Sequence, residues 1–265
     1  ESIHAKYAAA GSRIVNANTF GASAHKLAGS TYTLEQVITA GIENCKRACA
    51  PYGALTALDV GPLGELLEPS GTLAFEDAVA EYARIVKAGE AAGADLIFFE
   101  TYTDLYELKA ALLAAKENTH LPILASMSFE AGGRTFTGCT VESFAATARG
   151  LGADAVGINC SLGPKEIFPM AKRLAEAVPG NFPVFVKPNA GLPRADGSGY
   201  DITPQLFALQ MKPYRELHLF AAGGCCGTTP EFIKLLNGTF AGCTPGRPAH
   251  RMPSVLCTPV DTVTV

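Results

Sequence analysis

The sequence predicts an α/β protein, and more specifically a (β/α)8 TIM barrel that lacks its first strand in this chain. Short apolar runs alternate with longer amphipathic stretches along the chain. The runs are hydrophobic almost throughout, as parallel strands covered on both faces must be. The length of 265 residues is also typical of such a barrel. Seven runs qualify, at residues 12–19, 54–61, 95–101, 122–129, 154–160, 183–191 and 217–224.

Helical patterns fill the intervals between these runs. Residues 75–89 and 105–116 carry apolar side chains at helical spacing. Residues 1–10 read as the end of a helix that stops at Gly11, so the first strand of a complete barrel would precede this chain. An open doubly wound sheet is the alternative architecture, but no G-x-G-x-x-G follows any of the runs.

The last part of the chain differs in composition from the rest. Residues 238–265 are rich in Gly and Pro and end in the β-type sequence VDTVTV. We therefore expect a barrel over residues 1–237 and a C-terminal tail or linker over residues 238–265. A strand from this tail that partly fills the gap in the barrel is the alternative.

Composition excludes several classes of partner. The net charge is −4 and no block of Lys and Arg occurs, which argues against nucleic acid. No apolar run approaches the roughly 20 residues that span a bilayer, and no secretory leader is visible. Eight cysteines are too few for a disulfide scaffold in a chain of this length, so we expect free thiols and a cytoplasmic protein.

The stretch AAGGCCGTTP, residues 221–230, carries the strongest chemical signal. Cys225 and Cys226 lie between glycines at the turn from a predicted strand to a predicted helix. Adjacent cysteines rarely form a disulfide with each other, because the required geometry is strained. Two thiolates on one tight turn can instead bind a soft cation, with Zn–S bonds of about 2.3 Å.

A third sulfur is expected from Cys160, which ends the run at residues 154–160. In a barrel the carboxyl ends of the strands converge on one face, so Cys160 would meet Cys225 and Cys226 there. Three protein ligands leave one tetrahedral position open, as in catalytic zinc sites. Taken alone, Cys160 would suit core packing better than metal binding, because free cysteine is often buried.

Two further polar residues occur at strand ends. Glu100 follows the very apolar run DLIFF, where a buried carboxylate is costly unless it has a partner. We expect it to face the site; a hydrogen bond to a neighbouring loop is the alternative. Asn159 directly precedes Cys160, and we assign it to substrate binding.

Six motifs give the chain a family resemblance. It resembles the homocysteine methyltransferases over residues 1 to about 236, and is most similar to the homocysteine-binding module of cobalamin-dependent methionine synthases. The motifs occur in the order found in that family. They are NANTFGA at 16–22, FETYTDLYELKAA at 99–111, MSFEAGGRTFTG at 127–138, GINCSLGP at 157–164, KPNAGLP at 187–193 and GGCCGT at 223–228.

The resemblance implies a zinc barrel in which Cys160, Cys225 and Cys226 bind Zn²⁺ and the homocysteine sulfur takes the fourth position. It also places Glu100 at the substrate amino group, and Thr19 and Asn18 at the wall of the pocket. The family's first-strand turn, of the type D-G-A/G-M-G-T, does not occur in this chain.

The resemblance further implies transfer of a methyl group to the zinc-bound thiolate of homocysteine, forming methionine. The expected donor is methylcobalamin, or another methylcorrinoid, carried by a separate corrinoid-binding domain or protein. Two alternatives are kept. One is a zinc-binding barrel that is impaired or inactive, and the other is a self-contained enzyme that uses S-methylmethionine.

Overall fold

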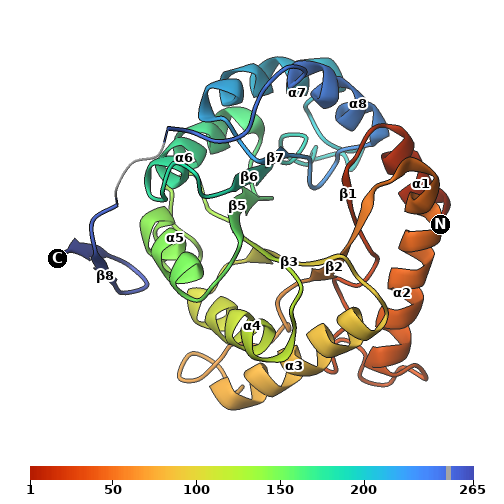
Figure 1. Cartoon of the computed structure of the whole chain (residues 1–265), viewed down its shortest axis with the longest axis vertical. Helices are drawn as coiled ribbons and strands as arrows, with labels where there is room; N and C mark the ends of the chain where they lie inside the picture. The colour runs from red at the N-terminus through yellow and green to blue at the C-terminus, as the bar shows by residue number, and fades with distance from the viewer. Residues whose placement is uncertain (249–251) are drawn as a thin grey trace. The chain divides into compact units, whose positions relative to one another are not determined.

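The computed structural model describes residues 1–248 and 252–265. His250, which the sequence assigns to no site, lies outside the described residues. Strands and helices alternate, and all seven predicted strands are present (Figure 1). They are β1 Ile14–Asn16, β2 Leu55–Val60, β3 Leu96–Tyr102, β4 Ile123–Met127, β5 Ala155–Asn159, β6 Val184–Lys187 and β7 Ala221–Ala222.

The helices follow the predicted periodicity and extend slightly beyond it. The predicted helix over residues 75–89 runs from Phe75 to Ala91, and that over residues 105–116 from Leu105 to Asn118. The α-helices are α1 Ser2–Ala9, α2 Leu34–Cys49, α3 Phe75–Ala91, α4 Leu105–Asn118, α5 Val141–Gly150, α6 Pro164–Glu176, α7 Pro204–Met211 and α8 Pro230–Thr239, with short 3₁₀ helices η1 Ala50–Tyr52 and η2 Lys212–Leu217.

The strands pair in the order of the sequence, from β1 to β7. Pairing is parallel between β1, β2 and β3 and again between β5, β6 and β7. This is the predicted α/β class with strand–helix repeats. The described residues form a sheet of seven strands, whereas a complete barrel has eight. The expectation of a barrel short of one strand is confirmed.

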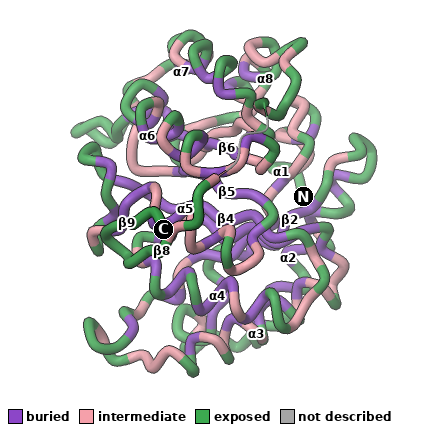
Figure 2. The backbone as a smooth tube through the Cα atoms, turned by 60° about the vertical axis from the view of Figure 1, so that its left-hand side comes forward, coloured by how far each residue is buried: buried purple, intermediate pink, exposed green. Residues whose placement is uncertain are grey.

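The described chain consists of two compact units. The first comprises residues 1–125 and 151–153, and the second residues 126–150 and 154–265. In the first unit, β2 and β3 are buried along nearly all of their length, as Figure 2 shows for β2. The rings of Tyr82 on α3 and of Phe99 and Tyr102 on β3 pack edge-on or tilted, with centroids about 6 Å apart, as aromatic pairs in cores prefer.

Helix α2 of the first unit shows how local sequence fixes an element. Its N-cap Thr33 accepts a hydrogen bond from the backbone of Gln36, whose side chain accepts one from the backbone of Thr33. This capping box satisfies two backbone donors that the helix itself cannot satisfy. The apolar face of α2 is buried and includes Cys45 and Cys49. Both cysteines therefore lie on a helix face, as their neighbours in the sequence suggest.

The second unit holds β5, β6 and β7, with α5 to α8 in the same stretch of chain. Asn159 at the end of β5 pairs with Lys187 at the end of β6. Val186 of β6 pairs with Ala222, the last residue of β7. The three strands thus end at the same edge, and the residues that follow them share one end of the unit.

The C-terminal segment forms its own small sheet in the second unit. Strands β8 (Val255–Cys257) and β9 (Thr262–Thr264) pair in antiparallel register and belong to no other sheet. The hairpin lies beside α5 (Figure 1), and the hydroxyl of Ser143 on that helix donates to the carbonyl of Asp261 at 3.2 Å. The alternative that this segment fills the gap in the barrel is therefore wrong, because its backbone groups pair within the hairpin. The domain boundary after residue 237 stays a prediction.

None of the described helices is both long and apolar enough to cross a membrane.

Candidate metal centre

Three cysteines meet at the carboxyl ends of strands in the second unit. Cys160 directly follows β5, and Cys225 and Cys226 lie in the turn after β7. Because β5, β6 and β7 are parallel neighbours, their carboxyl ends bring these two segments together although 65 residues separate them along the chain. Among the described residues, this is the one group of three potential metal ligands whose ligand atoms all lie within 4.8 Å of one another. The predicted convergence of the three cysteines is confirmed.

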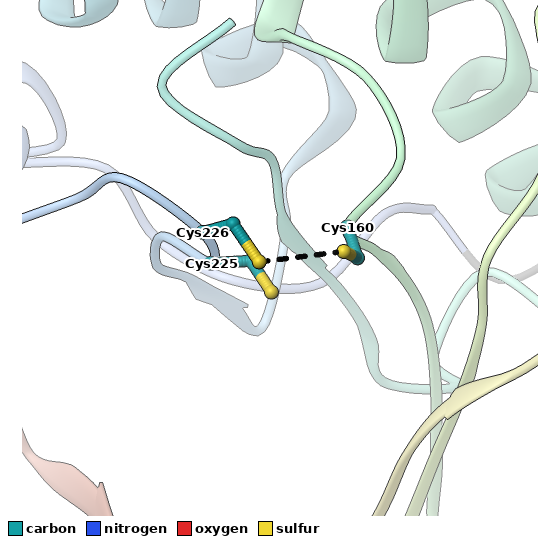
Figure 3. A group of neighbouring side chains, drawn as sticks. All are labelled: Cys160, Cys225 and Cys226. Carbon is teal, nitrogen blue, oxygen red and sulfur yellow. Dashed lines mark hydrogen bonds between the residues drawn. The ribbon is translucent and has the colours of Figure 1, made fainter. Parts of the chain in front are cut away.

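The sulfur positions suit a tetrahedral soft cation. The Sγ atoms of Cys160 and Cys226 are 3.7 Å apart, and all three side chains point toward a common space (Figure 3). Two sulfurs bound to one zinc at about 2.3 Å with tetrahedral angles would be separated by about 3.8 Å. The observed separation therefore fits two ligands of one ion. It is much longer than the disulfide bond length of about 2.05 Å, and none of the three cysteines forms a disulfide.

The backbone around Cys160 adopts a conformation that side chains usually avoid. Cys160 and Ser161 have φ angles of 63° and 61°, in the left-handed region. The Cys160 amide donates to the carbonyl of Lys187 at 3.1 Å, and its carbonyl accepts from Leu162 at 2.7 Å. Non-glycine residues held in this region cost of order 1–3 kcal/mol each and concentrate at functional sites. The turn aims the Cys160 sulfur toward the other two instead of continuing the strand.

The segment after β6 fixes the paired cysteines through its backbone. The amide of Cys225 donates to the carbonyl of Pro188 at 2.9 Å, and the carbonyl of Cys226 accepts from the amide of Ala190 at 2.9 Å. The side-chain oxygen of Asn189 accepts from the amide of Cys226 at 3.1 Å. The KPNAG motif therefore positions the GGCCGT motif. From the sequence, Asn189 reads only as a turn residue, and its contact with Cys226 could not be inferred.

Two positions in the cysteine turn, 224 and 227, require glycine because neighbouring side chains pack closely against them. Gly227 has φ of +79°, which favours glycine, and a Cβ there would lie 2.3 Å from ring atoms of Tyr200. At Gly224 a Cβ would lie 2.5 Å from the side chain of Thr228. The hydroxyl of Thr228 in turn donates to the carbonyl of Cys225 at 2.7 Å. The glycines thus allow close packing on both sides of the two cysteines.

Asn159, the last residue of β5, contacts the cluster. It is fully buried, its Oδ1 accepts from the hydroxyl of Ser126 at 2.8 Å, and its Nδ2 contacts the Sγ of Cys225 at 3.7 Å. The hydroxyl of Ser128 donates to the Asn159 carbonyl at 2.8 Å. These contacts orient an N–H group at a candidate metal ligand, the arrangement by which outer-shell residues tune a site. The assignment of Asn159 to substrate binding stays a prediction.

The cluster favours ionisation of at least one thiol. The pKa of Cys160 is lowered, first because the Cys225 thiol hydrogen-bonds to its sulfur and further because the Ser161 backbone does so. Burial and the proximity of Cys226 oppose this shift. Since metals bind the thiolate, a lowered pKa favours metal binding near neutral pH.

Three of the four predicted substrate residues lie in the first unit. Thr19 is buried, and its hydroxyl donates to the carbonyl of Asp59 and accepts from the Asp59 amide. Asn18 beside it is exposed. Glu100 is buried within β3, which continues to Tyr102, one residue beyond the predicted run at residues 95–101. The roles of these three residues in substrate binding stay predictions.

Comparison with known proteins supplies independent information. Residues 1–240 match the family model of homocysteine S-methyltransferase. Methionine synthase from Mycobacterium leprae (strain TN) is 31% identical over 93% of this chain, and that from Mycobacterium tuberculosis (strain ATCC 25618 / H37Rv) is 30% identical over 96%. The chain spans about a fifth of the length of these relatives, 21% and 22%.

Solved structures show the same fold. The homocysteine methyltransferase MmuM from Escherichia coli, in its oxidized form, superposes with a TM-score of 0.76 at 22% identity, covering 89% of this chain and 82% of MmuM. Its metallated form gives a TM-score of 0.72 at 23% identity, covering 89% of this chain and 83% of MmuM. At this level of identity the likeness establishes the TIM-barrel type of α/β fold alone.

Proposed function

Because the chain belongs to the homocysteine S-methyltransferase family, we propose that it binds Zn²⁺ through Cys160, Cys225 and Cys226 and presents homocysteine for methylation. The observation that carries the proposal is the convergence of three cysteine side chains, none in a disulfide, at the carboxyl ends of β5 and β7. A soft, sulfur-rich donor set of this kind selects zinc over hard cations such as Mg²⁺. Three protein ligands also leave the fourth tetrahedral position for the substrate sulfur.

The bound ion would supply deprotonation of the substrate thiol, whose pKa is otherwise near 8.5. With zinc held by Cys160, Cys225 and Cys226, the three cysteinates and the substrate thiolate would carry four negative charges against the two positive charges of the ion. The substrate sulfur would therefore retain enough electron density to attack a methyl group. The substrate thiol loses its proton to solvent, a carbon–sulfur bond forms, and the bond from the methyl group to its donor breaks, with the electron pair remaining on the donor.

The remaining residues of the cluster have positioning roles in this proposal. Asn189 fixes the backbone of the cysteine turn by accepting from the Cys226 amide. Asn159 directs its amide at the sulfur of Cys225. For recognition of homocysteine itself we retain Glu100 at the amino group, with Thr19 and Asn18 in the pocket and Asn159 as a further contact. We retain a methylcorrinoid on another domain or protein as the donor, and the cytoplasm as the compartment.

The proposal is tested on the whole chain by zinc content and homocysteine binding. We expect one zinc per chain in the wild type and loss of bound zinc in Cys225→Ala. The matched control is Cys243→Ala, since Cys243 is a free cysteine outside the cluster. Zinc content in Cys225→Ala equal to that of the wild type would contradict the proposal.

The donor is tested separately with zinc-loaded protein. Methionine formation from homocysteine and free methylcobalamin would support the corrinoid route. Methionine formation with S-methylmethionine, and none with methylcobalamin, would identify S-methylmethionine as the donor instead. Zinc binding without methionine formation from either donor would instead support the inactive zinc-binding barrel.

A further inference from the structure

A short hairpin between β6 and α7 carries a tyrosine to the cysteine cluster. Pro193 and Tyr200 form an antiparallel bridge, and the Arg194 amide donates to the carbonyl of Gly199 at 2.8 Å. The Arg194 side chain also donates to the carbonyl of Tyr200 at 3.1 Å. The backbone at Tyr200 is thus fixed from inside the hairpin.

The base of this hairpin is fixed as well. The carboxylate of Asp201 accepts from the amide of Leu192 at 2.8 Å, and the Asp201 amide donates to the Leu192 carbonyl at 3.1 Å. The amide of Ile202 donates to the carbonyl of Ala190 at 3.0 Å. Ala190 is itself bonded to the carbonyl of Cys226. One chain of backbone contacts therefore links the tyrosine-bearing hairpin to the cysteine turn.

The ring of Tyr200 lies against that turn directly. A Cβ on Gly227 would fall 2.3 Å from the Cγ and Cδ2 atoms of Tyr200, so the ring occupies the space that any other residue at position 227 would fill. Gly227 immediately follows Cys226 in the chain. The tyrosine therefore contacts the turn at the residue next to a candidate ligand.

The side chain of Tyr200 also lies close enough to the Cys226 side chain to interact with it. The pKa of Tyr200 is raised, first by desolvation and then by its side-chain interaction with Cys226 and the charges of Cys226, Cys160 and Cys225. A phenol has an ordinary pKa of about 10 and is therefore a hydrogen-bond donor near neutral pH. Cys225 receives a corresponding N–H from Asn159.

We infer that Tyr200 is a positioning residue of the metal centre, which donates a hydrogen bond to the Cys226 sulfur while its ring supports the Cys225–Cys226 turn. The inference rests on the proposed zinc-binding function. A donor to a metal-bound thiolate stabilises its negative charge, which matters in a site carrying up to four thiolates on one divalent ion. Loss of an outer-shell partner of this kind typically weakens metal binding or activity by about 10- to 100-fold.

Tyr200→Phe tests the hydroxyl, because it keeps the ring against Gly227. Zinc affinity would be measured at pH 7 by competition with a chromophoric chelator, and the sulfur-to-metal charge-transfer bands by absorption of the Co²⁺-substituted protein. We expect zinc affinity to fall by about 10- to 100-fold and the charge-transfer bands to shift. The control is Tyr32→Phe, since Tyr32 is highly exposed; we expect it to match the wild type in both measurements.

Tyr200→Leu separates the ring from the hydroxyl. Weaker zinc binding in Tyr200→Leu with wild-type affinity and unchanged Co²⁺ bands in Tyr200→Phe would overturn the inference, because the role would then be packing alone. Wild-type behaviour of both variants would overturn it as well. Failure of the wild type itself to bind zinc would contradict the proposed function instead, so the two failures can be told apart.

Discussion

Two cysteine pairs in this protein have nearly the same sulfur separation and opposite chemical character. On α2 the Sγ atoms of Cys45 and Cys49 are 3.8 Å apart, and in the cluster those of Cys160 and Cys226 are 3.7 Å apart. Yet the pKa of Cys45 is raised to about 12, chiefly by burial, whereas that of Cys160 is lowered by hydrogen bonds to its sulfur. Separation alone therefore does not identify a metal site.

The surroundings of the two pairs account for the difference. Cys45 and Cys49 are one turn apart on the buried face of a regular helix, and the thiol of Cys45 contacts the carbonyl of Val15. A thiol in that position serves as a small apolar side chain. Cys160 and Cys226 lie on irregular turns, partly open to solvent, with a third thiol beside them. Exposure, a third ligand and local hydrogen-bond donors distinguish the candidate site.

The largest expected effect is on zinc binding. We expect Cys226→Ala to weaken zinc binding by more than about 100-fold, because it removes one of the three protein ligands. This loss exceeds that expected when an outer-shell partner is removed. Cys49→Ala, the matched change in the other pair, should leave the affinity unchanged. Isothermal titration or chelator competition measures both. Equal losses in the two variants would mean that the α2 pair also takes part in metal binding.

Thiol reactivity provides the second contrast and carries a pH dependence. With a pKa of about 12, Cys45 is thiolate only to a fraction of about 10⁻⁴ at pH 8, and this fraction rises tenfold per pH unit below the pKa. We expect Cys45 to resist alkylation in the folded protein at pH 8, while the cluster cysteines react in the metal-free form and are protected by zinc. Peptide mass spectrometry after pulsed iodoacetamide measures this.

The same raised pKa has a consequence for stability. Because the folded-state pKa of Cys45 exceeds its ordinary value of 9.0, its protonated form stabilises the fold below pH 9, and this contribution is lost as the pH rises toward about 12. Rapid alkylation of Cys45 at pH 8, at a rate comparable with that of Cys160, would show that the pair is not buried as described.

The third contrast concerns the donor that contacts the cluster. We expect Asn159→Ala to weaken zinc binding by about 10- to 100-fold, because it removes the N–H that contacts the Cys225 sulfur. Ser126→Ala, which removes only the hydroxyl that orients Asn159, should have a smaller effect in the same direction. If Asn159→Ala binds zinc as the wild type does and instead loses homocysteine affinity, the predicted substrate role of Asn159 would be favoured over the supporting role.

The sequence could predict the ligands but not most of their supports. Cys225 and Cys226 were identifiable because two adjacent thiols between glycines suit metal binding better than core packing, and Cys160 because parallel strands place their carboxyl ends together. Asn189 and Tyr200 were not identifiable as supports, because their contacts depend on how the loops after β6 close over the cysteine turn. The strand pattern was predictable from hydrophobicity. The pairing of the C-terminal segment was not, because a short β-type run does not specify its partner.

The smallest expected effect is on stability without metal, where substitution in the α2 pair should cost more than substitution in the cluster. In zinc-free protein, Cys45→Ala should lower the free energy of unfolding by about 1–2 kcal/mol, because it removes a buried atom comparable with a methylene and leaves a small cavity. Cys226→Ala, at an exposed position, should change it by less than about 0.5 kcal/mol. Urea unfolding in the presence of a chelator measures both. If Cys226→Ala were the more destabilising change without metal, the thiols themselves would have to hold the left-handed turns around the cluster. That result would contradict the inference that backbone contacts form the site before metal binds.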